Sequence, residues 1–465
     1  MRPFSMRDKL GYTLGDLGCC CTEQFRAMYL SVFYTLILQV NPFHIGILML
    51  ITKIWDAVND PIIGAIVDSR KATKGGKFIP WIRAFSFPMA VLCILGFVNV
   101  SNLAYGLRLA YMFVTYVLYE ALYTCVNVPF GTLSSVMTDD VRHRTALSRY
   151  RSLGGTIFMT VIVMVGPLVL YVDNKPVAGR FLMLASVFAL IGLLCLQITC
   201  VWCKERVAVP ERPKGEKLNY LHVIKEIAKN KALLGVMFFS LVGMIGASVV
   251  NGLNTYLFKD YFGNVKIMAV SGGLSVLYSL ITFAITQPLA DKLGKKEWCC
   301  WGAGFAAAVF ALLFFFPIHN PVLFIVINGV CYLGASGMQV LIWAMVNDSI
   351  DYHELQTGER NEGIVYSTYS FFRKLASAVS GSLSSFVLGF IGYNVAEGAM
   401  QTAEVSNAIW KSYTGIYVLG YGVAVAILFF VYPLTKAKTT EMLEQLKARR
   451  AEKASAMETD GEQCP

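Results

Sequence analysis

Charge is scarce in this chain. Only 15% of its 465 residues are Asp, Glu, Lys or Arg, whereas an ordinary soluble domain carries about 25%. The hydrophobic share is 56%, and the mean hydropathy is +0.56. This combination excludes a soluble enzyme and favours one polytopic membrane domain, because each span needs about 20 apolar residues.

Metal-binding and catalytic patterns are also missing. The 12 cysteines, among them Cys19, Cys20 and Cys21, show no CxxC or Cys/His metal spacing, and the five histidines form no HExxH pair. No nucleophile with a base and no cofactor loop can be found. The sequence therefore predicts a protein that is not an enzyme and has no cofactor. The charged N-terminus lacks a small-residue cleavage site, so we expect no cleaved signal peptide.

Long apolar runs are what the chain has in abundance. Turn and charge signals separate them and predict an all-α membrane protein of twelve transmembrane helices. The expected spans are 10–40, 43–68, 79–100, 107–137, 150–172, 178–202, 232–258, 267–290, 297–317, 321–347, 362–392 and 409–435.

A polar stretch, KERVAVPERPKGEKLN at 204–219, separates the first six spans from the last six. The second span ends in DPIIGAIVDSRKATKGGK and the eighth in QPLADKLGKK, so each half has a proline, an acid and a basic turn at the same place. Repeated halves of this kind are typical of secondary transporters. The predicted organisation is an N-terminal half 1–203, a cytoplasmic linker 204–229, a C-terminal half 230–436 and a cytoplasmic tail 437–465.

Lys and Arg gather on one side of the predicted bundle. Most of the 40 lie in the N-terminus, the even-to-odd loops and the C-terminal tail. The opposite side holds only Arg108, Lys175, Arg180, Lys259, Lys266 and Lys411. Since cytoplasmic loops carry the excess of Lys and Arg, both termini are expected in the cytoplasm.

The second span contains acidic residues that indicate a function, because an ionised carboxylate at mid-bilayer costs about 2.5 to 3.5 kcal/mol. In KIWDAVNDPIIG, the spacing of Asp56, Asn59 and Asp60 puts all three on one helical face. Two neighbouring carboxylates repel unless a cation or proton lies between them, which predicts a coupling-ion site. The alternative is that both acids pair with a basic residue such as Lys374.

Other spans also contain polar side chains. In the fourth span, Thr124 can offer an oxygen to a small cation and Asn127 can bind a hydroxylated ligand, or both can simply bond across helices. Arg26 follows Glu23 in the first span, and Arg373 precedes Lys374 in the eleventh. These cations either pair internally with acids or leave one Arg to bind a substrate carboxylate.

Several segments resemble one known family over nearly the whole chain. They are IWDAVNDPIIGAIVDS, GKFIPW from Gly76, YTCVNVPFGTL and NDSIDYHELQTGERNEGIVYSTYSFFRK. The chain resembles the glycoside-pentoside-hexuronide:cation symporters of the major facilitator superfamily, including melibiose permease and, more closely, the bacterial glucuronide carriers. The resemblance implies a major facilitator fold of two six-helix halves, and it implies a sodium or proton site at Asp56, Asn59, Asp60 and Thr124 with Lys374 close by.

The sugar-binding positions depart from melibiose permease. Its first-helix aspartate corresponds to Cys20, its fourth-helix aspartate to Asn127, and its tenth-helix tryptophan to Gln339, while its fifth-helix arginine falls near Ser148 or Arg149. A galactoside is therefore not the expected substrate. The candidate substrate-binding residues are Cys20, Glu23, Arg26, Tyr123, Asn127, Arg149, Gln339, Ser370 and Arg373.

The expected function is symport of a glycoside, most readily a glucuronide or another acidic sugar, with sodium or a proton by alternating access. Alternatives are transport of neutral oligosaccharides or amphipathic conjugates on the same fold, or a membrane sensor that does not transport. The expected partners are the sugar, a monovalent cation and the lipid bilayer, without nucleic acid. We expect a monomer in the bacterial cytoplasmic membrane.

Overall fold

The computed structural model describes residues 3–69, 75–138, 140–207, 230–357, 362–396 and 400–461. Some helical positions within these ranges, among them Ser370 and Lys374, are described by their backbone alone.

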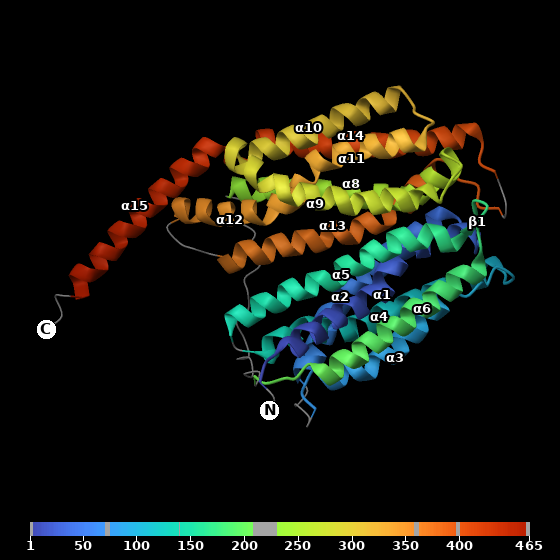
Figure 1. The fold of residues 1–465 in the computed structure, drawn as a ribbon, viewed down its shortest axis with the longest axis horizontal. Helices are drawn as coiled ribbons and strands as arrows, with labels where there is room; N and C mark the ends of the chain where they lie inside the picture. Colours follow the sequence, from blue (N-terminus) through green and yellow to red (C-terminus); the bar gives the residue numbers. More distant parts are fainter. Residues whose placement is uncertain are drawn as a thin grey trace. The chain divides into compact units, whose positions relative to one another are not determined.

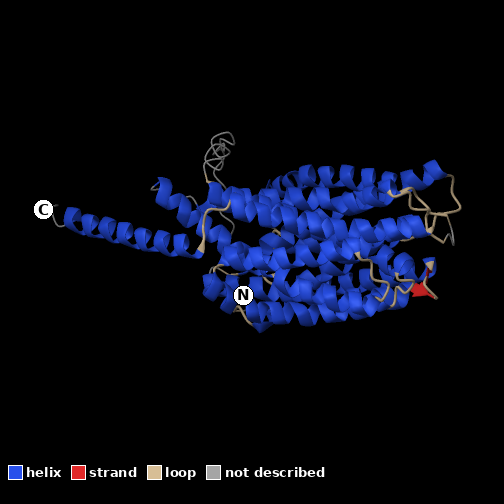
Figure 2. Cartoon of the chain, turned by 90° about the horizontal axis from the view of Figure 1, so that it is seen from above, coloured by secondary structure: helices blue, strands red, loops and turns tan. Residues whose placement is uncertain are grey.

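Helices make up nearly all of the described chain, and Figure 2 shows a single short hairpin as its strands. Figure 1 labels most of the elements along the chain. Their bounds are α1 Met6–Leu36, α2 Pro42–Ser69, α3 Ile79–Leu95, α4 Tyr105–Met137, α5 Val141–Leu170, β1 Tyr171–Val172, β2 Lys175–Pro176, α6 Ala178–Trp202, α8 Lys231–Tyr256, η1 Leu257–Tyr261, α9 Ile267–Leu293, α10 Lys295–Phe315, α11 Pro321–Ala335, α12 Gly337–Thr357, α13 Glu362–Phe390, α14 Ala403–Phe430 and α15 Lys436–Gly461.

These helices confirm the predicted all-α membrane fold. Within the described residues, eight stretches are long and apolar enough to cross a membrane. The expected tenth span, 321–347, is formed by α11 and α12, which are separated by Ser336 and extend the helical segment to Thr357. The remaining expected spans correspond to α1, α2, α3 and α13, where charged residues or a shorter apolar run weaken the hydropathy signal.

Contacts divide the chain into two compact units. Unit 1 comprises Met1–Pro213, Asn251–Gly273 and Gly381–Ile409, and unit 2 comprises Lys214–Val250, Leu274–Ser380 and Trp410–Pro465. Two short segments of the predicted C-terminal half thus belong with the N-terminal residues, because they pack there: Ser385 lies 3.1 Å from Ser31, oxygen to oxygen. The halves 1–203 and 230–436 stay a prediction about the repeat.

In unit 1, α1 packs closely against its neighbours because small residues let the backbones approach. An added Cβ at Gly18 would lie 2.8 Å from the carbonyl oxygen of Gly192 on α6. Large apolar side chains fill the remaining core, including Tyr12, Ile82 and Phe130, all 1% exposed or less. Helix α1, which carries Glu23 and Arg26, thus packs mainly against α5 and α6.

Glu205, in the chain after α6, contacts the beginning of α3. The Glu205 carboxylate accepts hydrogen bonds from the backbone N–H groups of Lys77, Phe78 and Ile79, at 2.7, 2.8 and 2.8 Å. These donors begin α3, where backbone N–H groups have no partner within the helix. Gly76 precedes them with a φ of +103°, and a side chain there would collide with Glu205.

The hairpin between α5 and α6 was not expected from the sequence. Tyr171 pairs with Pro176 and Val172 with Lys175, and the turn residues Asp173 and Asn174 have φ values of 48° and 62°. Asp and Asn tolerate this left-handed conformation better than most residues. The Asn174 side chain donates to the Lys259 carbonyl at 2.8 Å and accepts from the Val265 N–H at 2.9 Å, which joins the hairpin to η1 and to the turn after it.

Unit 2 has its own core, with Val236, Cys299 and Met345 each 0% exposed. Helix α15 extends from this unit (Figures 1 and 2), and its Met442 and Leu446 pack into the same core. Arg449 donates to the Leu355 carbonyl at 3.1 Å. The predicted cytoplasmic tail therefore contains a long helix whose first turns are docked on α12.

Candidate functional site

The predicted cation ligands lie on two neighbouring helices of unit 1. Asp56, Asn59 and Asp60 are on α2, and Thr124 is on α4. The Thr124 hydroxyl lies 3.1 Å from Oδ1 of Asp60 and 3.4 Å from Oδ1 of Asp56. A hydroxyl has one proton, so it donates to one carboxylate at a time. The structure thus brings two carboxylates of α2 to a single hydroxyl of α4.

Asn59 completes this oxygen-rich group on the same helical face. Its side chain is 5% exposed, and its amide Nδ2 is buried without a hydrogen-bond partner among the described residues. Carboxylate, hydroxyl and amide oxygens are the hard donors that small cations prefer. The donor set therefore suits a sodium ion, and the two carboxylates equally suit a proton.

A second set of charges surrounds these ligands. The Lys53 ammonium lies 3.8 Å from Asp56 and 3.7 Å from Glu120. The Arg26 guanidinium lies 3.5 Å from Glu120 and 3.9 Å from Glu23. Glu120 is 2% exposed and lies one turn before Thr124 on α4. Neither Glu120 nor Lys53 was assigned a role from the sequence, although an acid in an apolar span is a signal for function.

Arg26 is enclosed by internal partners. Its guanidinium carbon lies 3.4 Å from the ring centre of Tyr119 and 4.7 Å from that of Tyr116, and its side chain is 3% exposed. Cation–π contacts and two carboxylates both satisfy its charge. This geometry favours the structural role that the sequence left open for Arg26 over contact with a substrate.

Another ion pair lies near Cys20 in unit 1. Arg151 Nε donates to Asp16 Oδ1 at 3.0 Å, and the Gly155 N–H donates to Asp16 Oδ2 at 3.0 Å. The Arg151 side chain is 39% exposed, and the Cys20 thiol lies 3.9 Å from Asp16. The sequence placed the fifth-helix arginine near Ser148 or Arg149, and Arg151 is the arginine of α5 whose side chain contacts Asp16 of α1. A shift of two residues turns a helical side chain to another face.

The structure describes the side chains of some of the remaining predicted residues but not of all. Tyr123 stacks on Tyr119 with ring centres 6.0 Å apart, and Asn127 is half-buried one turn further along α4. Arg149 is exposed. The side chains of Ser370 and Lys374 lie outside the described residues.

In unit 2, Gln339 and Arg373 are both exposed. The Arg373 guanidinium carbon lies 5.8 Å from the ring centre of Trp343. Trp343 is one turn after Gln339 on α12 and packs edge-on against Tyr369 with ring centres 5.0 Å apart. Arg373 therefore has an aromatic neighbour that the sequence did not identify.

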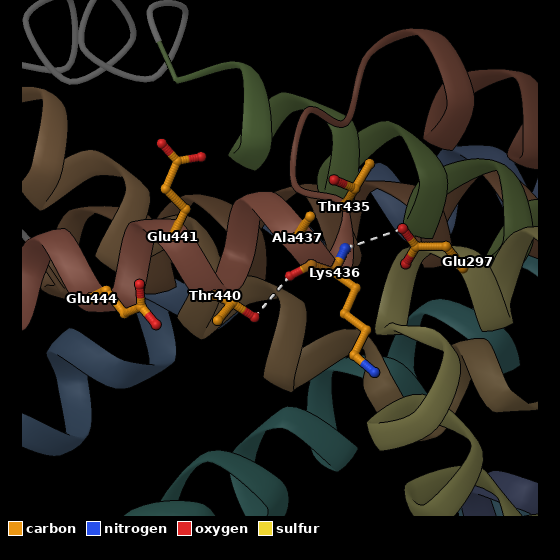
Figure 3. Close-up of a pocket in the computed structure, with 7 residues that line it drawn as sticks. All are labelled: Glu297, Thr435, Lys436, Ala437, Thr440, Glu441 and Glu444. Atoms are coloured by element: carbon orange, nitrogen blue, oxygen red, sulfur yellow. Dashed lines mark hydrogen bonds between the residues drawn. The ribbon is translucent and has the colours of Figure 1, made fainter.

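A surface hollow also lies where α15 begins, and Figure 3 shows its lining. The Lys436 N–H donates to Glu297 at 3.1 Å, and the Thr440 hydroxyl donates to the Lys436 carbonyl at 3.1 Å. Glu297, Glu441 and Glu444 give it an acidic character. None of the predicted site residues lines this hollow, so the candidate functional site is the group of buried charges in unit 1.

Comparison with known proteins identifies the family. The model of the family "MFS/sugar transport protein" matches residues 11–436. The chain is similar to an uncharacterized symporter of Bacillus subtilis, YjmB, with 31% identity over 95% of each chain. It is 29% identical to the isoprimeverose transporter of Lactiplantibacillus pentosus, with coverage of 97% of this chain and 93% of that one. A glucuronide carrier protein homolog of Escherichia coli is 25% identical, with 96% of each chain covered.

Solved structures support the same fold. The crystal structure of a D-xylose-proton symporter matches with a TM-score of 0.59 at 15% identity, covering 93% of this chain and 98% of that one. At this identity the likeness concerns the fold alone. The fold and the family match together confirm a multi-pass membrane transporter that is not an enzyme, and they confirm the resemblance to cation-coupled glycoside symporters. The chain belongs to the MFS/sugar transport protein family.

Proposed function

We propose that this sugar symporter drives uptake of an acidic glycoside, a glucuronide or a close relative, with a sodium ion or proton bound at Asp56, Asn59, Asp60 and Thr124. The observation that carries the ion site is the Thr124 hydroxyl, 3.1 and 3.4 Å from two carboxylates inside membrane-spanning helices. Two carboxylates held this close are stabilised by a shared cation.

Coupling follows from the charge balance at this site. When a cation neutralises Asp56 and Asp60, basic residues that would otherwise pair with them are released. We assign this part to Lys374, as the family resemblance implies. The change in charge favours closure around the substrate only when both ligands, or neither, are bound, which is the requirement for symport.

Two arginines support an acidic substrate. Arg151 on α5 is 39% exposed, and Arg373 on α13 is exposed in the middle of a spanning helix. Arg binds a carboxylate with two parallel hydrogen bonds, which makes it the usual residue for this recognition. The similarity to the glucuronide carrier protein homolog agrees with this substrate class.

A neutral glycoside is the second candidate, and one observation favours it. Arg26 and Arg151 both already contact carboxylates of the protein, Glu120 and Asp16. An Arg–Asp pair such as Arg151–Asp16 presents donors and acceptors to sugar hydroxyls without needing a substrate charge.

Uptake into proteoliposomes separates these candidates. The substrate is labelled 4-nitrophenyl β-glucuronide, and the competitor is 4-nitrophenyl β-glucoside, which carries a hydroxymethyl group where the glucuronide carries its carboxylate. We expect the glucoside to compete at least about tenfold less well than unlabelled glucuronide. If the glucoside competed as well as the glucuronide, the carboxylate would not be recognised, and a neutral glycoside would be the better candidate substrate.

The proposal includes the orientation of the protein in the membrane and its oligomeric state. We place both termini in the cytoplasm, because Lys and Arg concentrate on that side of the sequence. The protein functions as a monomer in the bacterial cytoplasmic membrane in this account.

A further inference from the structure

The charges beside the cation ligands form one connected group on three helices. Glu23 and Arg26 lie on α1, Lys53 on α2 and Glu120 on α4. Each of these side chains is within 4 Å of another member, and Lys53 extends the group to Asp56. The three helices α1, α2 and α4 are therefore linked electrostatically to the cation site.

Lys53 is the member placed between two competing carboxylates. Its ammonium is 3.8 Å from Asp56 and 3.7 Å from Glu120, so neither partner holds it more closely. Asp56 is 27% exposed, whereas Glu120 is 2% exposed. A lysine head group is a compact charge on a flexible stem, so small movements change which carboxylate it favours.

Glu120 is more deeply buried than Lys53, 2% exposed against 23%. One carboxylate oxygen faces Arg26 and the other faces Lys53. Arg26 is itself held by two tyrosine rings. Glu120 is therefore a buried carboxylate between two cations, and a buried carboxylate charge needs a nearby cation.

We propose that Lys53 is a tethered cation that competes with the coupling ion for Asp56, and that Glu120 is the position to which its ammonium moves when the ion binds. This inference rests on the proposed ion site. Binding of a sodium ion or proton at Asp56 and Asp60 repels the Lys53 ammonium, and Glu120 accepts it at no cost of an unpaired buried charge. Glu120 is thus a positioning residue that tunes ion affinity without contacting the ion.

Removing the charge of Glu120 leaves Lys53 with Asp56 as its carboxylate partner among the described residues. Glu120→Gln should therefore raise the half-saturating concentration of the coupling ion by roughly fivefold or more, with little change in the half-saturating sugar concentration at saturating ion. Lys53→Met should have the opposite sign and lower the ion requirement.

The matched control is Glu23→Gln. Glu23 also contributes negative charge near the site, but its carboxylate contacts Arg26 rather than Lys53. Glu23→Gln measures how much the loss of one nearby negative charge changes the half-saturating ion concentration. We expect this change to be smaller than the change caused by Glu120→Gln.

The experiment measures uptake of labelled 4-nitrophenyl β-glucuronide in proteoliposomes against the concentration of whichever ion, sodium or proton, drives the wild type. It compares Glu120→Gln, Glu23→Gln, Lys53→Met and the double variant Lys53→Met/Glu120→Gln. In the Lys53→Met background, the Glu120→Gln effect should fall to that of Glu23→Gln, because the competitor is gone. A Glu120→Asp variant, which keeps the charge, covers the case in which Glu120→Gln fails to fold.

Equal effects of Glu120→Gln with and without Lys53 overturn this inference while leaving the proposed function intact. The same holds if Glu120→Gln and Glu23→Gln change the ion requirement equally. A wild type that neither ion drives overturns both the ion site and the role of Lys53.

Discussion

At the scale of single residues, the Thr124 hydroxyl is the link between the two helices that form the ion site. Thr124→Val keeps the shape and removes the hydroxyl, so the two carboxylates lose their only described hydroxyl donor. We expect the half-saturating ion concentration to rise by about tenfold or more, as for the loss of one hydrogen bond to a charged group. Ion-dependent uptake checks this, with Thr124→Ser as the control that restores the hydroxyl. Normal ion dependence in Thr124→Val would contradict the assignment.

We expect Arg26 to stabilise the fold and not to contact the substrate. Arg26→Ala leaves Glu23 without its described ion-pair partner and Glu120 with Lys53 alone, which should destabilise the protein by about 3 to 5 kcal/mol. Uptake of acidic and neutral glycosides should fall alike, together with the unfolding temperature in detergent. Arg26→Lys keeps the charge and should recover part of both. Selective loss of the acidic substrate with normal stability would instead place Arg26 in the substrate site.

The residue scale also shows what the sequence could and could not supply. The spacing of Asp56, Asn59 and Asp60 on one helical face follows from 3.6 residues per turn, so it could be predicted. The proximity of Thr124, Glu120 and Lys53 depends on how α2 packs beside α4, and no local pattern reports that packing. The Arg151–Asp16 pair depends in the same way on how α5 packs beside α1.

At the scale of elements, Glu205 organises the beginning of α3. Its carboxylate accepts hydrogen bonds from the backbone N–H groups of Lys77, Phe78 and Ile79. Glu205→Gln removes the negative charge from a helix N-terminus and should lower the free energy of unfolding by about 1 to 2 kcal/mol. Thermal unfolding in detergent measures this, and Glu444→Gln on exposed α15 provides the control. An unfolding temperature equal to that of the control would show that the capping contributes nothing.

The hairpin is stabilised by one side chain whose backbone is also unusual. Asn174→Ala removes two hydrogen bonds, one to η1 and one to the turn after it, and places Ala at a φ of 62°. We expect a loss of about 2 to 4 kcal/mol, the sum of both contributions. Asn174→Gly removes the bonds but relieves the backbone, so its unfolding temperature should lie between those of Asn174→Ala and the wild type. If Asn174→Gly matched Asn174→Ala, backbone strain would have no part in the effect.

Elements also differ in how well the sequence predicts them. Long apolar runs defined most spans, because hydropathy reports burial in lipid directly. The hairpin 171–176 was missed because its strands have two residues each, too short for any alternating pattern. The helical extension of α12 to Thr357 was missed because its last turns are polar, as in NDSIDYHELQT.

At the scale of the whole molecule, the family match explains why fold and function class follow together. The spans, the linker and the repeated basic turns predict a transporter, and the match over residues 11–436 confirms the family. Substrate and ion are narrower questions, because they depend on a few side chains among hundreds. The positions of Asp16, Arg151 and Arg373 give those questions specific residues to test.

The most direct measurement of the central claim is concentrative uptake of labelled 4-nitrophenyl β-glucuronide into proteoliposomes under an inward sodium gradient, with a matched proton gradient as the paired condition. We predict accumulation above the external concentration under one of the gradients, and its loss when an ionophore dissipates that gradient. Asp60→Cys, still inserted in the membrane, should abolish accumulation because the ion site has lost one of its two carboxylates. Undiminished accumulation by Asp60→Cys would contradict the account.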